Sequence, residues 1–347
     1  MTVSILRADA RALPLADQSV DLIVTSPPYY GQRAYEDQGE AYTGQLGDED
    51  HPTQFIAELV ACTREWMRVL KPSGSIFVNL GDSYYSGKGA PTQPDPKNAA
   101  RRLGLRPLDR SGLGYPRKSL LLLPERYRIA CLDQLGLTVR AVVVWSKPNP
   151  TPEKGGDRVR RTHEDWVHLT LRPRYYADIT PIREPASGYQ RHTNASRPAA
   201  SGQKVRGLAD KCNPLGKPPG SVWSVATDPF VAPGHLDVDH DAPFPMEFPR
   251  RLIEAWCPGG GAVLDPFGGT GTTALVAHAL GRHGISVDMS ADYCRLAAWR
   301  TSDPAQIAKA MRVEKPPTQM DGQLDLLAMS AAVSSTPAVP GPEASDA

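Results

Sequence analysis

Four consecutive residues early in the chain could bind and activate an amine: Ser26, Pro27, Pro28 and Tyr29. They follow the apolar run 20–24, which predicts a strand, so they would lie at its carboxyl end. Proline fixes the backbone and cannot donate a hydrogen bond. The serine hydroxyl and the Pro27 carbonyl therefore offer two rigid acceptors, and the tyrosine offers a planar face. Such acceptors would hold the two N–H groups of a ring amine and free its lone pair.

A glycine-rich turn late in the chain is a second candidate binding segment. It follows the apolar run 262–264 and precedes a predicted helix at 274–280. Glycine lets the backbone approach a ligand closely, and free N–H groups at the start of a helix favour an anionic group. Asp288 ends the next predicted strand and could accept hydrogen bonds from a ribose diol. The residues of the turn are Asp265, Pro266, Phe267, Gly268, Gly269, Thr270 and Gly271.

The turn by itself is compatible with more than one cofactor. Gly269, Gly271 and Ala274 also fit the GxGxxA pattern of dinucleotide binding, which keeps a nicotinamide-dependent dehydrogenase open. That alternative explains the glycines and Asp288, but it does not explain the segment 26–29.

The elements that must position these residues alternate between strand and helix. This order is typical of a parallel α/β sheet, in which binding residues lie at the carboxyl ends of the strands. Helical spacing of apolar residues predicts helices at 54–70, 124–135, 250–256, 274–280 and 291–301. Apolar and β-branched runs predict strands at 3–8, 20–24, 75–80, 138–145, 167–171, 262–264 and 284–288.

Composition narrows the class of protein. The 347 residues are 40% hydrophobic, and 39 Lys and Arg nearly balance 38 Asp and Glu, which excludes a histone-like basic protein and an acidic solvating chain. No apolar run approaches the roughly 20 residues of a membrane span. The start of the chain does not resemble a secretory signal, and no CxxC pair predicts a zinc site or a disulfide framework. We therefore expect a cytoplasmic protein that uses no membrane and no metal.

The balanced total charge hides an uneven distribution. Residues 1–60 hold ten acids and three bases, whereas residues 101–128 hold eight bases and two acids, and residues 183–222 hold seven bases and two acids. Two basic stretches that are interrupted by glycine and proline are typical of a surface that binds a polyanion.

Taken together, the two candidate segments resemble those of the DNA amino-methyltransferases that use S-adenosylmethionine. The order of the segments, catalytic first and cofactor last, is similar to the circularly permuted β group of that family. The matching residues are Ser26–Tyr29 and Asp265–Thr273, with further matches at Asn79–Asp82, Trp145–Pro148, His163–Glu164 and Pro243–Pro249. The resemblance implies an α/β, Rossmann-like methyltransferase fold with a mixed, mostly parallel sheet. It also implies base flipping and a target-recognition region of variable sequence.

The resemblance also implies roles for single residues. The turn 265–271 would cradle the methionine part of S-adenosylmethionine, and Asp288 would hold the ribose hydroxyls. Asp9, which follows the first predicted strand, would approach the adenine. Tyr29 would stack on the flipped target base, and we expect Tyr30 and Tyr35 to be packing or loop residues and Trp223 to be a hydrophobic anchor.

Two features of the sequence bear on which atom of DNA is methylated: the absence of a Pro-Cys thiolate, and the serine at position 26. Methylation of cytosine carbon 5 needs a thiolate that its family presents as Pro-Cys, and no cysteine here follows a proline. Direct transfer to an exocyclic nitrogen remains. Serine at the first position of the segment goes within the family mostly with cytosine, so we expect N4-cytosine, with N6-adenine as the alternative. An inactive DNA-binding module and enzymes that methylate RNA or protein glutamine fit less well.

The resemblance divides the chain into regions. Residues 1–182 would form the catalytic half, with a basic insertion at 86–118, and residues 236–311 the cofactor-binding half. The irregular segment 183–235 between them would recognise double-stranded DNA. Its candidate contacts to phosphates or guanine edges are Arg183, Arg191, Arg197, Lys204 and Arg206.

The last region, 312–347, is rich in proline, alanine and serine, and its composition predicts a disordered tail. Within it, Gln323–Leu327 (Gln-Leu-Asp-Leu-Leu) resembles the short peptide by which bacterial replication proteins bind the sliding clamp. The clamp is therefore a candidate partner, and so is a cognate restriction enzyme.

Overall fold

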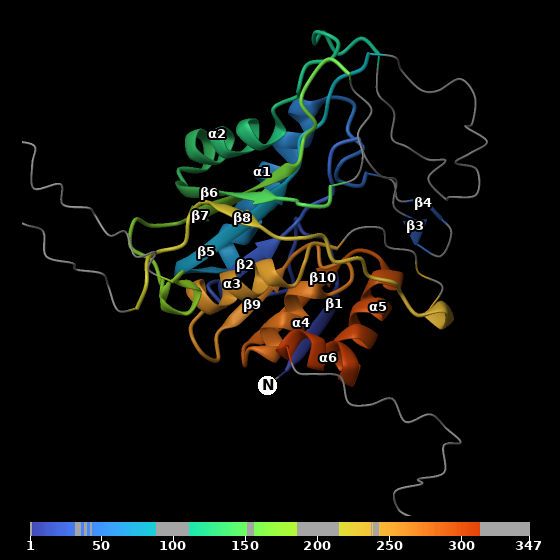
Figure 1. Cartoon of the computed structure of the whole chain (residues 1–347). Helices are drawn as coiled ribbons and strands as arrows, with labels where there is room; N and C mark the ends of the chain where they lie inside the picture. The colour runs from blue at the N-terminus through green and yellow to red at the C-terminus, as the bar shows by residue number, and fades with distance from the viewer. Residues whose placement is uncertain are drawn as a thin grey trace, which may run out of the picture.

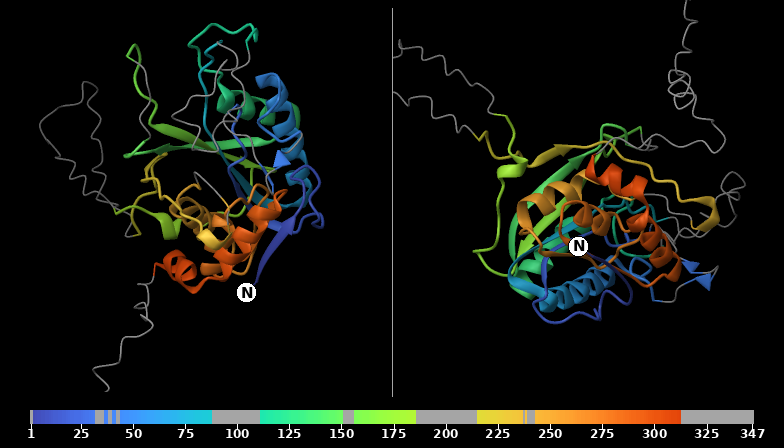
Figure 2. Two further views of the ribbon diagram at one scale, coloured as in Figure 1. Left: turned by 90° about the vertical axis from the view of Figure 1, so that its right-hand side faces the viewer. Right: turned by 90° about the horizontal axis from the view of Figure 1, so that it is seen from below.

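The computed structural model of the chain describes residues 2–31, 44–87, 111–150, 156–185, 215–236, 238 and 243–312, and the backbone of 36–37 and 40–41. Within these ranges a single eight-stranded sheet runs through the molecule between two layers of helices (Figures 1 and 2). Strands β3 (Glu36–Asp37) and β4 (Glu40–Ala41) form a separate two-stranded antiparallel sheet, and they lie between β2 and α1 in the sequence. Tyr35, Arg191, Arg197, Lys204, Arg206, most of the insertion 86–118 and the tail 313–347 lie outside the described residues.

The large sheet is mixed and mostly parallel, as the sequence predicts. Its strands, in spatial order, are β1 (Val3–Arg7), β10 (His283–Asp288), β9 (Ala262–Asp265), β2 (Val20–Thr25), β5 (Leu70–Leu80), β7 (His163–Thr170), β6 (Thr138–Ser146) and β8 (Val222–Ser224). From β1 to β5 all neighbours run parallel. Strand β7 is antiparallel to both β5 and β6, and β8 closes the edge parallel to β6.

Helices cover both faces of the sheet and bury two separate apolar cores. On one face lie α1 (Pro52–Val69) and α2 (Leu123–Leu135), and on the other α3 (Glu247–Trp256), α4 (Thr272–Ala279), α5 (Ala291–Ser302) and α6 (Pro304–Met311) (Figure 1). Strand β5 serves both cores because successive side chains point to opposite faces. Ile76 and Val78 belong to the core under α1, whereas Phe77 belongs to the core under α3.

The pairing of β2 with β9 joins two segments that are far apart in the sequence. The two strands run parallel, with Leu22 opposite Val263 and Ile23 opposite Leu264. Parallel neighbours in register end at the same edge of the sheet, so the segment that follows Thr25 meets the turn that begins at Asp265. Since β10 is the next parallel neighbour of β9, Asp288 reaches that edge as well.

Some elements differ from the sequence-based expectation, among them β5, β8 and α6. Strand β5 begins at Leu70 directly after α1, because Leu70 pairs with Val20 and the ladder then shifts until Ser75 pairs with Leu22. Strand β8 lies in the segment 183–235, which was expected to be irregular, and it forms because Val222–Ser224 pair with the edge strand β6. Helix α6 was not expected, and it begins with the Asp303 side chain as its N-cap. None of the described helices combines the length and the apolar character that crossing a membrane requires.

The start of α2 depends on a carboxylate from another element. Its N-cap residue Leu122 has a φ of 57° and makes no side-chain cap. The buried Asp82, just after β5, accepts hydrogen bonds from the backbone N–H of Leu122 at 3.0 Å and of Leu123 at 3.1 Å. This carboxylate therefore supplies the cap and the favourable negative charge at the helix N-terminus.

We expect Asp82→Ala to lower the free energy of unfolding by about 2 kcal/mol, because the first N–H groups of α2 lose a charged acceptor. Urea denaturation measures the change, and Asp133→Ala, at an exposed position of the same helix, is the control. Equal stability of the two variants would show that Asp82 does not cap α2.

Candidate functional site

A cavity of about 560 Å³ lies at the carboxyl ends of the parallel strands and brings the two candidate segments together. This volume falls within the range of small-molecule sites. The cavity is lined by all of Ser26, Pro27, Pro28 and Tyr29, by Pro266, Phe267, Gly268, Gly269 and Thr270, and by Asp288 and Asp9. These residues come from both ends of the chain, so the fold assembles one site from segments about 240 positions apart.

Three other candidates lie away from the lining. Asp265 and Gly271 belong to the glycine-rich turn but do not border the cavity. Arg183 donates through Nη1 to the backbone oxygen of Gly216 at 2.9 Å and also lies outside the cavity lining.

The glycine-rich turn is shaped by contacts within the protein. A Cβ atom on Gly268 would overlap the Ser286 hydroxyl, and one on Gly271, which has a φ of 75°, would lie 2.9 Å from the Cβ of Ala297. These two glycines let the turn pack against β10 and α5, a role different from the close approach to a ligand that the sequence predicts. Gly268, Gly269 and Thr270 of the packed turn line the cavity.

Two backbone N–H groups hold the carboxylate of Asp288, which lines the cavity. Its Oδ2 accepts from the N–H of Gly269 and its Oδ1 from the N–H of Ser290, each at 2.9 Å. The carboxylate is therefore held at the end of β10 with a defined orientation. A carboxylate in this place suits a ribose diol, because each oxygen can accept more than one hydrogen bond.

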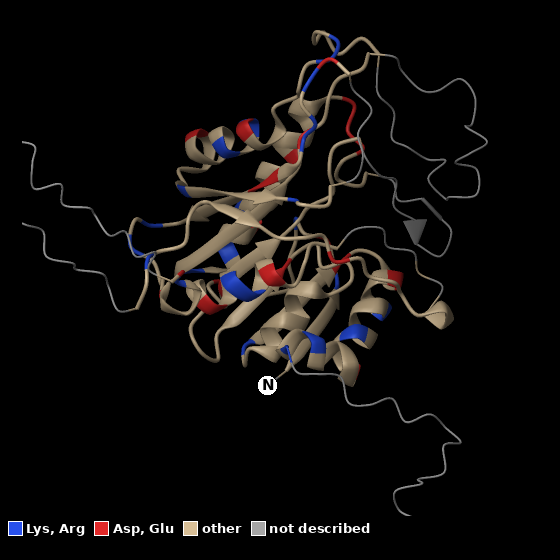
Figure 3. Cartoon of the chain, in the orientation of Figure 1, with Lys and Arg blue, Asp and Glu red and all other residues tan. Residues whose placement is uncertain are grey.

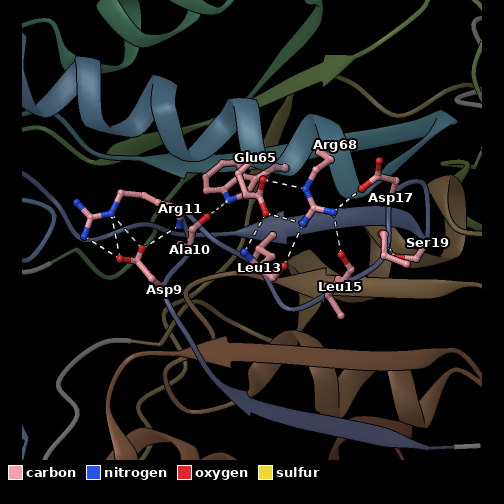
Figure 4. Close-up of polar contacts among 11 residues, drawn as sticks. Asp9, Ala10, Arg11, Leu13, Leu15, Asp17, Ser19, Glu65 and Arg68 are labelled. Carbon is pink, nitrogen blue, oxygen red and sulfur yellow. Dashed lines mark hydrogen bonds and ion pairs between the residues drawn. The ribbon is translucent and has the colours of Figure 1, made fainter.

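Asp9 stands on a loop that α1 holds in place (Figure 4). Its carboxylate accepts from the backbone N–H of Arg11 and pairs with the Arg11 guanidinium, both at 2.8 Å. Farther along the loop, Arg68 of α1 donates to the backbone oxygens of Leu13 and Leu15 at 3.0 and 2.9 Å. The loop after β1 is thus tied to α1, and Asp9 reaches the cavity from a fixed backbone.

Asp265 connects the two halves of the site from below the cavity. This carboxylate is 1% exposed. Its Oδ1 accepts from the hydroxyl of Thr25 at 2.7 Å and from the N–H of Phe267 at 3.1 Å, and its Oδ2 accepts from the hydroxyl of Thr273 at 3.0 Å. Thr25 is the residue before Ser26, so one buried group fixes both the start of the segment 26–29 and the turn.

The other half of the site is a polar network around Tyr29. Its phenol oxygen lies 2.8 Å from Oδ1 of Asn79 and 2.9 Å from Oε2 of Glu164. Burial raises the pKa of Tyr29 well above its ordinary value, and the nearby charge of Glu164 adds to the shift, so the phenol stays protonated. The Ser26 hydroxyl lies 3.3 Å from the same Asn79 oxygen.

Several residues of this network had no role assigned from the sequence. Asn79, Trp145, Lys147 and Glu164 all line the cavity, and all four lie in segments that the sequence analysis quoted only as matches. A polar side chain at the carboxyl end of the apolar strand β5 was the available signal for Asn79. Glu164 gave no such signal, because it lies near the start of a strand, which reaches this edge only because β7 is antiparallel.

Gly81 supports the ring of Tyr29 from behind. A Cβ atom at this position would lie 2.7 Å from Cε2 and 3.1 Å from Cδ2 of the tyrosine. The ring therefore packs directly on the backbone after β5, while part of it remains accessible to the cavity. In the part of the chain that the structure describes, no group of three or more His, Cys, Asp or Glu side chains could hold a metal ion.

The mixed, mostly parallel sheet and the cavity at its strand ends fit the fold of an S-adenosylmethionine-dependent methyltransferase. The chain belongs to the N6/N4 DNA methylase family, whose model matches residues 20–298. It is similar to the type II methyltransferase M.SmaI of Serratia marcescens, at 35% identity over 85% of this chain and 89% of the relative. It is also similar to M.XycI of Xanthomonas campestris pv. cyanopsidis, at 35% identity over 82% of each chain.

A solved structure shows the same fold. The PvuII DNA methyltransferase, described as cytosine-N4-specific, superposes with a TM-score of 0.58 at 21% identity, covering 90% of this chain and 92% of that chain. The predictions of an amino-methyltransferase family, of the fold and of S-adenosylmethionine as cofactor are confirmed. The chain is a DNA methyltransferase. The roles of single site residues and the division into regions stay predictions.

The stability of the protein should depend on pH through the buried carboxyl group of Asp265. Burial raises the pKa of Asp265 to about 6, against the opposing hydrogen bonds from Thr25, Phe267 and Thr273. In the unfolded chain this pKa is about 3.9. Because the folded state binds the proton more tightly, this stabilisation is complete below the unfolded value and is lost as pH rises through about 6.

We therefore expect the free energy of unfolding of the wild type, relative to Asp265→Asn, to fall by about 1.4 kcal/mol between pH 5 and pH 7.5. Urea titrations of both proteins across this range measure the difference. A difference that does not change with pH would show that Asp265 does not titrate there.

The position of the Tyr29 ring should depend on Gly81. We expect Gly81→Ala to lower kcat for DNA methylation by about 100-fold, because the new methyl group displaces the ring by roughly 1 Å. The control is Gly259→Ala, since no atom lies within 4 Å of a Cβ at that position. An equal kcat for both variants, with equal melting temperatures, would contradict the proposed support.

Proposed function

We propose that this enzyme transfers a methyl group to the exocyclic N4 of cytosine in double-stranded DNA by flipping the base and by direct transfer. The observation that supports this most directly is the shared cavity. The amine-binding segment 26–29 and the turn before α4 line one space, so a base amine and a methyl donor could meet there.

S-adenosylmethionine supplies an electrophilic methyl group on its sulfonium when it is bound. The residues present fit this cofactor. The turn backbone at 268–270 and Phe267 would hold its methionine part, Asp288 would hold the ribose hydroxyls, and Asp9 would approach the adenine. Asp265 and Gly271 would act on this binding only through the shape of the turn.

The base half of the site would hold the amine and its ring. The Ser26 hydroxyl has a protein acceptor, Asn79, for its own proton, which leaves its lone pairs for an incoming N–H group. The carbonyl of Pro27 would accept the second N–H. Tyr29 would stack on the flipped base with its phenol tip fixed by two partners. The protein then contributes mainly positioning.

The cavity also contains a thiol, and its chemistry favours direct transfer. Cys62 lines the cavity, but burial raises its pKa to about 12. A thiol of this kind stays protonated near neutral pH and is a poor nucleophile. A covalent adduct at cytosine carbon 5 therefore gains no support from Cys62.

Cytosine is favoured over adenine because residue 26 is serine. Either amine could donate to the same acceptors, so N6-adenine is the alternative target. The match to the DNA methylase family argues against a nicotinamide dehydrogenase.

Contacts to DNA outside the cavity are proposed for the segment 183–235. The described helices on both layers of the molecule carry Lys or Arg as well as Asp or Glu (Figure 3). The basic excess of 183–222 would supply phosphate contacts through Arg183, Arg191, Arg197, Lys204 and Arg206. A cognate restriction enzyme, binding of the clamp through Gln323–Leu327, and a cytoplasmic location belong to the same proposal.

The test of the target base is direct. Duplex DNA is incubated with the enzyme and S-adenosylmethionine, digested to nucleosides and analysed by mass spectrometry. We expect N4-methylcytosine, and we expect Ser26→Ala to reduce its formation by at least about tenfold because an acceptor of the amine is lost. Formation of N6-methyladenine alone would overturn the assignment of the base.

A further inference from the structure

A buried arginine of α5 contacts the glycine-rich turn and the first residue of α4. Arg300 is 3% exposed. Its Nη1 donates to the hydroxyls of Thr270 at 2.5 Å and Thr272 at 2.8 Å, and more weakly to the backbone oxygen of Thr270 at 3.4 Å. The guanidinium carbon lies 4.2 Å from the centre of the Phe230 ring. Within the part of the chain that the structure describes, Arg300 forms no ion pair and its Nε has no hydrogen-bond partner.

The positive charge of Arg300 is therefore not neutralised by a direct contact. Burial lowers the pKa of Arg300 to about 10, and the charge of Asp228 opposes this shift, so the guanidinium stays charged near neutral pH. Asp228 itself is paired with Lys309 of α6 at 2.9 Å. A buried cation without a paired carboxylate is unfavourable, because burial removes its hydration. An anion bound nearby would offset that cost.

The basic side chains of the described cavity lining are, in contrast, already paired. Arg11 lies 2.8 Å from a carboxylate oxygen of Asp9, and Lys147 lies 2.5 Å from one of Glu164. An anionic group in the cavity would have to compete with a carboxylate for either of them. Arg300 presents no such competition.

The hydroxyls of Thr270 and Thr272 connect Arg300 with the cavity. Both residues line it, and the two hydroxyl oxygens lie 3.1 Å apart. Each oxygen accepts from Arg300 and keeps one proton of its own. One of these protons can lie between the two oxygens, and the other has no acceptor among the described residues. That proton belongs to a hydroxyl polarised by a cation, so it suits an anionic acceptor.

The start of α4 favours the same kind of ligand. Its N-cap residue Gly271 provides no side-chain cap, so the first N–H groups of the helix have no acceptor of that kind. Such groups, together with the helix dipole, attract a negative charge. The anionic group of S-adenosylmethionine is the carboxylate of its methionine part.

We propose that Arg300 is a positioning residue for S-adenosylmethionine, which acts through Thr270 and Thr272 to hold the carboxylate of the methionine part. This inference rests on the proposed function, which places that part of the cofactor against the turn. The carboxylate end of the cofactor would then be held beside α4, and Asp288 would hold the ribose.

The test compares two ligands that differ only in this carboxylate. Isothermal titration calorimetry measures the affinity of the full chain for S-adenosylmethionine and for decarboxylated S-adenosylmethionine, which keeps the adenosine, the sulfonium and the amine. We expect the wild type to bind the complete cofactor at least about tenfold more tightly. Arg300→Met should weaken that binding by about 10- to 100-fold, the cost of losing hydrogen bonds to a charged group, and should weaken binding of the analogue by no more than about twofold.

The folding of the variant is checked by thermal melting without ligand. We expect Arg300→Met to fold, because an apolar side chain of similar length removes a buried charge that has no ion-pair partner. If it does not fold, the double variant Thr270→Val/Thr272→Val is titrated with the same two ligands. It removes both hydroxyls, keeps the branched shape, and should lose the same preference for the complete cofactor.

The control is Arg295→Met on the same helix. Arg295 is exposed, pairs with Asp292 at 2.7 Å and lies outside the cavity lining, so this variant should bind both ligands as the wild type does. Equal affinities of the wild type for the two ligands, or equal losses for both in Arg300→Met, would overturn the proposal. Equal losses would show that Arg300 only shapes the turn. A wild type that prefers the complete cofactor but methylates no exocyclic amine of DNA would overturn the proposed function alone.

Discussion

The buried carboxylate of Asp265 joins the two halves of the site, and the geometry of the cavity depends on it. One oxygen accepts from Thr25 at the end of β2, and the other accepts from Thr273 in the first turn of α4. A single group of this size cannot satisfy both partners unless the two strand ends stay at a fixed separation. The carboxylate is almost fully removed from water, which makes each lost hydrogen bond costly.

Above this connection, the site uses charged and neutral groups for different tasks. Asp288 and Asp9, which border the cavity, are each held by hydrogen bonds from the backbone. The base half instead relies on Ser26, Asn79 and Tyr29, which are neutral at the proposed point of transfer. The ion pair there between Lys147 and Glu164 is neutral as a unit. A neutral pocket suits a base that must keep its amine uncharged before transfer.

Much of the fold could be predicted because its signals are local. The apolar runs and helical spacing gave β2, α1, β6, α4 and β10 to within a few residues. The short edge strand β8 could not be predicted, since its three residues are strand only through their pairing with β6. The candidate site was predicted in part. Asn79 and Glu164 were quoted without a role because their partners belong to other strands.

The sequence by itself determined which chemical groups are present and their order: rigid acceptors after one strand, a glycine-rich turn after another, and a carboxylate after a third. Only the tertiary structure decided that these three groups line the same cavity, because the pairing of β2 with β9 and of β9 with β10 joins strands that are distant in the sequence. It also decided that Asp265 lies beneath the cavity and that Gly268 and Gly271 serve protein packing. Burial and the direction of a side chain depend on neighbours distant in the chain, and no local pattern of residues contains them.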